Sequence, residues 1–408
     1  MNIYISGISG TGMGPLALMA KAAGYEVSGS DLEKGAIYDE LINAGINVHI
    51  GPQDGEFLKS ELKNHQIDWF AYTSALPEDH AELKIAKEQN LKTTKRDDLT
   101  TYLVEKLGLK MIAVAGTHGK TTTTSMIIYA ALKLGLKISY IVGTTLGFAP
   151  SGSYQKGDEF FIYEADEYDK NFLKFHPWLA VLPAVSYDHP DIYPTIKDYQ
   201  DAFRQFESQS EIVLETGLSP DKFTLAGAVR RKNAGLAASA IIYMAPNLDQ
   251  TKIIETLDTF PGVGRRFEKL SDGVYSDYAH HPEEISATLD IANDEAKKLG
   301  KKGIVVVYQP HQNTRQHEVK DDYKDAFLKA DKLFWIPTYL TRENPELKTL
   351  TPQDLINVLS NKQIAEPAEL NPELKQALQK YLEDNYLIIL MTAGPADTWF
   401  RKNFAKKH

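Results

Sequence analysis

The sequence predicts an α/β protein of three domains, each with a parallel sheet covered by helices. Short hydrophobic runs alternate with helical stretches along the whole chain, which is typical of such sheets. A glycine-rich turn follows the first predicted strand, and a second glycine loop follows the predicted strand at 111–115. The length of 408 residues is also that of two or three domains. We therefore expect domains at 1–105, 106–262 and 263–408, of which the first and third are Rossmann-like.

The composition excludes several classes of protein. Hydrophobic residues make up 43% of the chain and charged residues 25%, which is ordinary for a globular protein. The net charge of −10 argues against a general nucleic-acid or membrane-surface partner. The lack of cysteine excludes disulfides, thiol nucleophiles and thiolate metal sites. Residue 1 leads directly into a predicted strand and no hydrophobic stretch reaches membrane-span length, so we expect a cytoplasmic protein without a signal peptide.

The first domain begins with a pattern that is typical of a Rossmann-type nucleotide site. A strand at 2–6 leads into a turn with four glycines, a helix follows at 15–23, and the next strand, 26–29, ends before an acidic residue. The same motif serves any diphosphate, so NAD is not implied, and a purely structural glycine turn is the alternative. The predicted ligand-binding residues are Gly7, Gly10, Thr11, Gly12, Met13, Gly14, Ser30 and Asp31.

Three more strands are expected in this domain, at 47–50, 69–73 and 92–94. Ser74 directly follows the strand at 69–73, and ligand loops collect at the ends of strands in such sheets. We therefore add Ser74 to the predicted ligand-binding residues.

The second domain begins with a phosphate-binding loop. The strand at 111–115 breaks into a loop with two glycines, and a helix that continues to about 134 starts near Lys120. The glycines let backbone N–H groups point at phosphates, and the start of the helix adds its positive end. Lys120 can then reach the β/γ-phosphates, and the hydroxyl of Thr121 can bind Mg²⁺. The two glycines are closer together than in the standard loop, but the order of strand, loop and helix favours ATP binding. The predicted loop residues are Gly116, Thr117, His118, Gly119, Lys120, Thr121 and Thr122.

Polar clusters follow two more predicted strands of this domain. The strand at 160–163 runs into a cluster of acids that begins with Glu164. A Mg-ATP site needs a hard carboxylate ligand there, so we predict that Glu164 binds metal rather than forming a solvated turn. The strand at 179–185 leads to His189, which two aspartates flank, and we predict a functional rather than a structural histidine. Strands at 138–142 and 211–215 and a helix at 232–244 complete the domain.

The third domain again alternates strands and helices. The stretch GVGRRF at 262–267 looks like the hinge into it, and its adjacent arginines suit an anion. Two predicted strands, 274–277 and 303–308, lead into polar clusters. These clusters contain Asp277, Tyr278 and His280 in one case and His311 and Arg315 in the other. The other expected elements are helices at 282–299 and 321–330, strands at 332–336 and 387–391, and a frayed helix from 401 to the end.

Taken together, these motifs resemble the Mur ligases, ATP-dependent amide-forming enzymes of peptidoglycan precursor synthesis. The matching stretches follow the family's order over nearly the whole chain. They are GISGTGMG (7–14), AGTHGKTTTT (115–124), EADEYD (164–169), DHPD (188–191), GVGRRF (262–267), DYAHHP (277–282) and QPHQNTR (309–315). The resemblance implies a UDP-sugar domain, a central ATPase domain and a C-terminal domain that brings the amino acid, with ATP and Mg²⁺ as the cofactors.

The resemblance also assigns roles to the matching positions. The implied catalytic residues are Lys120, Glu164 and His189. The implied Mg²⁺ ligands are Thr121 and Glu164 on one ion and His189 on a second. Besides the phosphate loop, the implied ATP-binding residues are Asn233, Arg266, Asp277 and His280. The glycine turn of the first domain, with Ser30, Asp31 and Ser74, would hold the UDP sugar. Tyr278, His311 and Arg315 would contact the amino acid or other anionic parts of the substrates.

Within the family, the chain is most similar to the branch that attaches L-alanine to UDP-N-acetylmuramate, and Tyr339 with Arg342-Glu343 also fits that branch. The alternative is the recycling ligase, which attaches the tripeptide L-Ala-γ-D-Glu-meso-diaminopimelate to the same nucleotide sugar. A catalytically inactive nucleotide-binding homologue is a further alternative. An NAD dehydrogenase would fit the first glycine turn alone but not the second loop. The expected partners are UDP-N-acetylmuramate and L-alanine, and the expected state is a monomer or weak homodimer.

Overall fold

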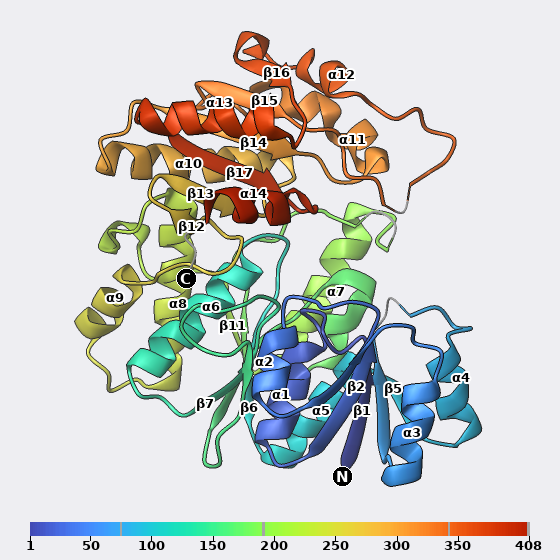
Figure 1. Cartoon of the computed structure of the whole chain (residues 1–408). Helices are drawn as coiled ribbons and strands as arrows, with labels where there is room; N and C mark the ends of the chain where they lie inside the picture. Colours follow the sequence, from blue (N-terminus) through green and yellow to red (C-terminus); the bar gives the residue numbers. More distant parts are fainter. Residues whose placement is uncertain (74–75, 190–191, 342, 406–408) are drawn as a thin grey trace. The chain divides into compact units, whose positions relative to one another are not determined.

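A computed structural model of the chain describes residues 1–73, 76–189, 192–341 and 343–405 (Figure 1). The chain divides into two compact units. The first consists of Met1–Phe223 and Lys232–Pro261, and the second of Thr224–Arg231 and Gly262–His408. The described residues form two sheets in the first unit and one in the second. The predicted α/β class is confirmed. The first predicted domain and most of the second lie in the same compact unit, whereas residues 224–231 and 262 belong to the other unit.

The first sheet has the strand order β3-β2-β1-β4-β5, and all its strands are parallel. The strands are β1 (Asn2–Ser6), β2 (Glu26–Asp31), β3 (Asn47–Ile50), β4 (Trp69–Tyr72) and β5 (Lys92–Lys95). The helices are α1 (Gly14–Ala22), α2 (Tyr38–Asn43), α3 (Glu56–Asn64), α4 (Ala81–Glu88) and α5 (Arg96–Leu107). Ile3 and Ile5 of β1 pack with α1, α2 and α5, whereas Tyr4 packs with α3 and α4 on the other face. The alternation of side chains along the strand therefore buries both faces of the sheet.

The second sheet has the order β11-β10-β6-β9-β7-β8, and only the short β8 is antiparallel among the described strands. The strands are β6 (Lys110–Val114), β7 (Ile138–Ile141), β8 (Gly152–Ser153), β9 (Phe160–Glu164), β10 (Leu179–Val181) and β11 (Ile212–Leu214). The helices are α6 (Lys120–Lys133), η1 (Tyr168–Lys174), α7 (Ile196–Ser208), η2 (Pro220–Lys222), α8 (Ala228–Met244) and α9 (Gln250–Asp258). The predicted strand at 179–185 is too long, because Pro183 has no N–H for the ladder and Ala184 instead bonds to Thr117 in the phosphate loop.

The two sheets of the first unit are joined through β8. The backbone N–H and hydroxyl of Ser151 donate to the Glu40 carboxylate of α2 at 2.7 and 2.9 Å. A Cβ atom at Gly152 would lie only 1.9 Å from the carbonyl oxygen of Pro15 in α1. The backbones therefore approach each other at a point where only glycine fits.

The third sheet, in the second unit, has the order β12-β13-β17-β14-β15-β16. The strands are β12 (Glu268–Ser271), β13 (Val274–Asp277), β14 (Ile304–Gln309), β15 (Lys332–Trp335), β16 (Ala365–Pro367) and β17 (Leu387–Thr392). The helices are α10 (Pro282–Lys298), α11 (Asn313–Val319), η3 (Lys320–Asp325), α12 (Pro352–Ile356), η4 (Lys362–Ile364), α13 (Pro372–Glu383) and α14 (Ala396–Phe404). Strand β12 is antiparallel to β13, and the other pairs are parallel.

Two helix predictions in this unit need correction. The predicted helix at 321–330 is too long, because the structure has a 3₁₀ helix, η3, that ends at Asp325, and turns follow it. Tyr323 is buried there and bonds to Tyr308 and Gln316, so tertiary contacts fix the tighter turn. The predicted C-terminal helix begins earlier than 401 and ends at Phe404, and residues 406–408 lie outside the described residues.

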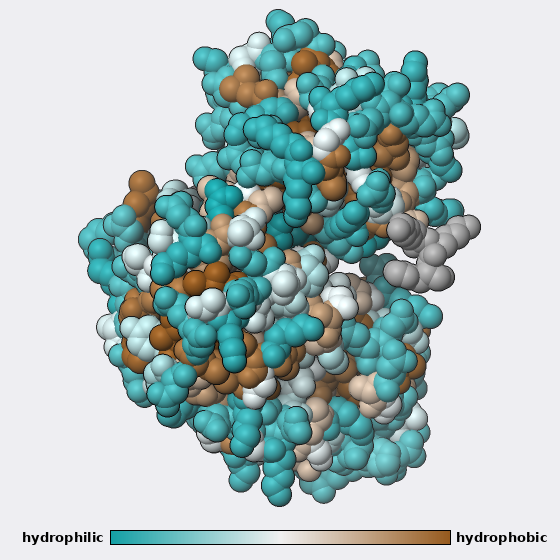
Figure 2. Space-filling model, turned by 90° about the vertical axis from the view of Figure 1, so that its left-hand side faces the viewer, coloured by the Kyte–Doolittle hydropathy of each residue, from teal (hydrophilic) through white to brown (hydrophobic). Residues whose placement is uncertain are grey.

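The surface carries both hydrophilic and hydrophobic areas. On the face shown in Figure 2, hydrophilic residues predominate and hydrophobic residues form separate areas among them. Exposed large hydrophobic side chains in the first unit include Leu132 and Tyr243. Among the described residues, no helix combines the length and hydrophobicity that crossing a bilayer requires.

Candidate functional site

The predicted phosphate loop lies between β6 and α6. Gly116 has φ of +143° and Gly119 has φ of +84°, a backbone region that favours glycine. A Cβ atom at Gly116 would lie 2.6 Å from the carbonyl oxygen of Ala184, and one at Gly119 would lie 3.0 Å from the Asn233 side chain. Both glycines are therefore required by the shape of the loop. The predicted residue Asn233 is buried beside it.

Thr117 ties this loop to the end of β10. Its backbone N–H donates to Ala184 at 2.7 Å, and its hydroxyl donates to the carbonyl of Ser186 at 2.5 Å. His118 completes the loop, and Thr122 lies in the first turn of α6, directly after Lys120 and Thr121. All the predicted loop residues thus lie together at the carboxyl end of β6.

Lys120 is the first residue of α6, and its ammonium is held by the backbone of the loop and by Glu167. Nζ donates to the carbonyl of Gly116 at 2.6 Å and to Oε1 of Glu167 at 2.9 Å. Burial disfavours the charge on Lys120, but the attraction of Glu167 outweighs it and raises the pKa of Lys120 above its ordinary value. Lys120 therefore places a fixed positive charge beside the glycine loop. A bound phosphate needs such a charge.

Glu167 is a residue of this cluster to which sequence reasoning gave no role. Its side chain is 1% exposed, and its Oε1 lies 3.7 Å from Nε2 of His189. Its carbonyl oxygen accepts a hydrogen bond from the Tyr193 hydroxyl at 2.5 Å. Burial alone would raise the pKa of Glu167, but its bonds to His189 and Lys120 lower it. The cluster of acidic residues after β9 indicated a functional segment in the sequence. The sequence does not show which of these acids faces Lys120.

Thr121 and Glu164, which are both predicted to bind the same metal ion, are in direct contact. The Thr121 hydroxyl donates to Oε1 of Glu164 at 2.7 Å. Oε2 of Glu164 is buried and has no hydrogen-bond partner among the described residues. A hydroxyl beside a carboxylate with an unsatisfied oxygen is a donor set that fits a hard cation such as Mg²⁺.

His189, the third predicted metal ligand, lies beside Glu167 and Asp188. Its φ of +57° is uncommon for a residue other than glycine and is often seen at functional sites. Within the described ranges, no three His, Asp or Glu side chains already form a cation-binding group. The metal role of His189 therefore stays a prediction.

The glycine turn of the first sheet is bound to the end of β2. The N–H groups of Gly7 and Ile8 donate to the carbonyl of Ser30 at 2.8 and 3.1 Å. Oδ2 of Asp31 accepts hydrogen bonds from the N–H and hydroxyl of Ser9 at 2.9 and 2.8 Å. Asp31 thus holds the turn in place, and its predicted contact with a sugar nucleotide stays a prediction.

Glu82 of α4 lies beneath this turn and was missed by sequence reasoning. It is fully buried and accepts hydrogen bonds from the hydroxyls of Tyr4 and Ser6, each at 2.6 Å. The hydroxyl of Ser30 also donates to it, at 2.7 Å, so Ser30 has a partner inside the protein. Met13 is buried in the core under the turn, whereas Thr11 is exposed. Ser74 lies outside the described residues.

In the second unit, the predicted residues lie where β13 and β14 end. Nη1 of Arg315 lies 2.7 Å from Nε2 of His280, and Nδ1 of His280 lies 3.1 Å from the carbonyl of Tyr278. Because Arg315 can only donate, we assign the neutral ring with its proton on Nδ1. Burial, reinforced by Arg315, lowers the pKa of His280 below its ordinary value, which agrees with that assignment.

The other predicted residues of this unit surround this pair. The guanidinium of Arg266 lies 5.0 Å from the ring centroid of Tyr278, and the rings of His311 and His280 are 6.0 Å apart. The two oxygens of the buried Asp277 accept backbone hydrogen bonds from Phe267 and Ala279 at 2.7 and 2.8 Å. Asp277 therefore fastens the GVGRRF stretch to β13, and its predicted nucleotide contact stays a prediction.

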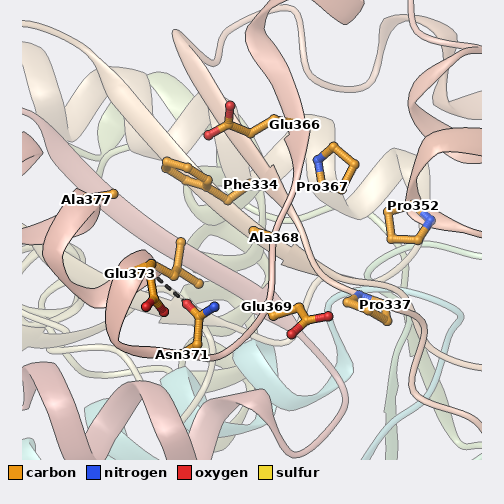
Figure 3. Close-up of a pocket in the computed structure, with 11 residues that line it drawn as sticks. Phe334, Pro337, Pro352, Glu366, Pro367, Ala368, Glu369, Asn371, Glu373 and Ala377 are labelled. Atoms are coloured by element: carbon orange, nitrogen blue, oxygen red, sulfur yellow. Dashed lines mark hydrogen bonds between the residues drawn. The ribbon is translucent and has the colours of Figure 1, made fainter.

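A separate cavity of about 640 Å³ lies in the second unit, near β15, β16 and α13 (Figure 3). Phe334 and Leu374 line it together with the carboxylates of Glu366, Glu369 and Glu373. The predicted site residues do not line it. Its acidic lining is also unsuited to the anionic ligands predicted above.

Comparison with known proteins identifies the family. Three family models match the chain in order: "Mur ligase family, catalytic domain" at 2–106, "Mur ligase middle domain" at 114–214 and "Mur ligase, glutamate ligase domain" at 265–394. The UDP-N-acetylmuramate–L-alanine ligase of Clostridium tetani is 31% identical, over 96% of this chain and 95% of the relative. The ligase of the same name from Clostridium perfringens is 32% identical, over 84% of each chain.

Two solved structures share the fold. The UDP-N-acetylmuramate-alanine ligase MurC of Thermotoga maritima matches with a TM-score of 0.79 at 23% identity, over 98% of each chain. The murein peptide ligase of Psychrobacter arcticus matches with a TM-score of 0.63 at 21% identity, also over 98% of each chain. From the family models and the relatives of similar length, we conclude that the chain belongs to the Mur ligase family.

Proposed function

We propose that this protein is an ATP-dependent ligase that joins L-alanine to the carboxylate of UDP-N-acetylmuramate, in peptidoglycan precursor synthesis. One observation carries the proposal: a half-buried Lys120 at the mouth of a glycine loop adjoins Thr121, which is hydrogen-bonded to Glu164. This arrangement suits phosphoryl transfer, and the names of the similar clostridial ligases supply the substrates. The proposed domains are 1–105 for the UDP sugar, 106–262 for ATP and 263–408 for the amino acid, and we expect the enzyme to work in the cytoplasm.

The chemistry explains why ATP is needed. A carboxylate is a poor acyl donor because its leaving group would be oxide. In the proposed reaction a carboxylate oxygen attacks the γ-phosphorus, ADP leaves, and an acyl phosphate forms. The amine of L-alanine then attacks the acyl carbon and expels inorganic phosphate, which keeps the oxygen of the former carboxylate. The amine loses a proton in this step, and the candidates for accepting it are His189 and a nearby water that Mg²⁺ would hold.

The residues around the loop address the main obstacle, which is the approach of two anions. Lys120 would bind the transferred phosphate and offset the repulsion between it and the carboxylate. Thr121 and Glu164 would hold one Mg²⁺ and His189 would hold a second, and each ion when bound neutralises phosphate charge. Glu167 would hold Lys120 and His189 in place, because its carboxylate already contacts both.

The other clusters would bind the remaining substrates. The glycine turn at 7–14, with Ser30, Asp31 and Ser74, would hold the diphosphate and sugar. Asn233, Arg266, Asp277 and His280 would contact ATP. In the second unit, Tyr278, His311 and Arg315 would bind the amino acid, and Arg315 suits its carboxylate because a guanidinium matches a carboxylate with two donors.

Phosphate release tests this function. The purified protein is given ATP, Mg²⁺ and UDP-N-acetylmuramate with L-Ala, L-Ser, Gly or the L-Ala-γ-D-Glu-meso-diaminopimelate tripeptide. We expect release with L-Ala; release with the tripeptide alone would indicate a recycling ligase, and no release with any amine an inactive homologue. Lys120→Ala should abolish turnover and leave UDP-sugar binding nearly intact, whereas loss of both would contradict the proposed division into domains.

A further inference from the structure

Arg96 lies against the glycine turn of the first sheet, although it is far from the turn in sequence. It is the first residue of α5, directly after β5. A Cβ atom built on Gly12 would lie 3.2 Å from Nη1 of Arg96. The guanidinium therefore lies at the turn, and the lack of a side chain at Gly12 leaves it the room to do so.

A small network fixes the direction of this guanidinium. Nε of Arg96 donates to Oδ1 of Asp97 at 2.9 Å, and the same oxygen accepts a hydrogen bond from the Tyr163 hydroxyl at 3.0 Å. Asp97 and Tyr163 are both buried. The terminal nitrogens of Arg96 make no hydrogen bond with the described residues, and the side chain is 23% exposed. One edge of the guanidinium is thus anchored, while its terminal donors remain available.

An anionic ligand at this turn needs such a cation. The chain carries a net charge of −10, so backbone N–H groups would have to hold a diphosphate against a negative field. A guanidinium with two available donors matches two phosphate oxygens, and a charge-assisted pair of this kind is stronger than bonds from neutral donors.

We propose that Arg96 binds the diphosphate of the sugar nucleotide at the glycine turn of the first sheet. This inference rests on the proposed function, because it concerns the same substrate. It adds the side chain that recognises the diphosphate, which lies outside the seven stretches that carry the resemblance.

Binding of ligand fragments tests the inference without turnover. Titration calorimetry compares UDP with uridine, which lacks the diphosphate, for the wild type, Arg96→Gln and Arg96→Lys. The matched control is Arg204→Gln, which removes an arginine that is 59% exposed on α7. We expect Arg96→Gln to weaken UDP binding by about 10- to 100-fold and to change uridine binding by less than about twofold. Arg96→Lys should keep part of the affinity, and Arg204→Gln should match the wild type.

Other outcomes would overturn the inference. Equal losses for UDP and uridine would show a general loss of structure, and unchanged UDP binding would show that Arg96 takes no part. A loss seen with UDP-N-acetylmuramate but not with UDP would place Arg96 at the sugar-borne carboxylate instead. If Arg96→Gln does not fold, Arg96→Lys decides alone, through a loss of UDP affinity that exceeds its loss of uridine affinity. Failure of the wild type to bind UDP at all would overturn the proposed function itself.

Discussion

The ammonium of Lys120 lies 2.7 Å from Oε2 of Glu167, and both side chains are largely buried. A buried ion pair of this kind is costly to break from one side, because the remaining charge loses its partner. The same carboxylate lies beside His189, so one acid holds two of the residues predicted to act in catalysis.

Replacing Glu167 should therefore impair both stability and activity. Glu167→Gln leaves Lys120 without a counter-charge. We expect the unfolding free energy to fall by at most about 3–5 kcal/mol and kcat to fall by about tenfold or more. Asp169→Asn is the control, because Asp169 is 45% exposed and pairs only at the surface with Lys95. Urea unfolding measures the change in stability, and steady-state kinetics measures the change in kcat. Equal values for Glu167→Gln and Asp169→Asn would contradict the role of Glu167.

Removal of the Glu164 carboxylate should change the dependence on metal. Glu164→Gln replaces an anionic oxygen with an amide beside Thr121, so we expect the Mg²⁺ concentration for half-maximal activity to rise by about 10-fold or more. Glu159→Gln, an exposed position just before β9, should leave it unchanged. A Mg²⁺ titration of initial rates makes the comparison. An unchanged Mg²⁺ requirement in Glu164→Gln would exclude Glu164 as a ligand.

The close approach at Gly152 predicts a position that tolerates no side chain. Gly152→Ala places a Cβ atom against the backbone of Pro15, and we expect a loss of about 1–3 kcal/mol in unfolding free energy. Gly147→Ala is the matched control in the segment just before β8, since a Cβ atom there meets no neighbour within 4 Å, and its effect should stay within about 0.5 kcal/mol. Urea denaturation tests both. Equal effects would mean that α1 and β8 do not approach as described.

The lowered pKa of His280 predicts a pH effect with a definite sign. The folded protein binds a proton at this ring less readily than the unfolded chain, so falling pH favours unfolding once it passes below the ordinary histidine value of 6.5. The stability is present above that value and lost below it. We compare melting temperatures at about pH 7.5 and about pH 5.5, which lie on either side of the pKa of free histidine. The melting temperature of the wild type should fall more over this range than that of His280→Gln. His65→Gln, at an exposed histidine, should behave as the wild type. The same pH dependence in wild type and His280→Gln would refute the neutral ring.

Much of the fold could be predicted because local patterns determine it. The predicted strands at 2–6 and 47–50 coincide with β1 and β3, where hydrophobic or β-branched runs stand between clear turn residues. The 3₁₀ helix η3, which replaces the helix predicted at 321–330, could not be predicted, because the bonds of Tyr323 to Tyr308 and Gln316 are tertiary. The two-residue strand β8 left no pattern long enough to recognise.

Part of the candidate site was likewise predictable from the sequence, and part was not. The loop around Lys120 was predictable, because its glycines and its helix start are neighbours in the sequence. Glu167 and Arg96 received no role from the sequence, because only their contacts in the fold identify them. Glu167 contacts Lys120, and Arg96 lies at the turn beside Gly12. Such contacts depend on how strands and helices are arranged, which residue spacing alone does not give.

The transfer of a labelled oxygen tests the central claim most directly. UDP-N-acetylmuramate is prepared with ¹⁸O in both oxygens of its carboxylate and incubated with the enzyme, ATP, Mg²⁺ and L-alanine, and the inorganic phosphate is analysed by mass spectrometry. If ATP activates the carboxylate as an acyl phosphate, each phosphate released from labelled substrate carries one ¹⁸O atom. Phosphate free of label, formed together with the amide product, would contradict the account.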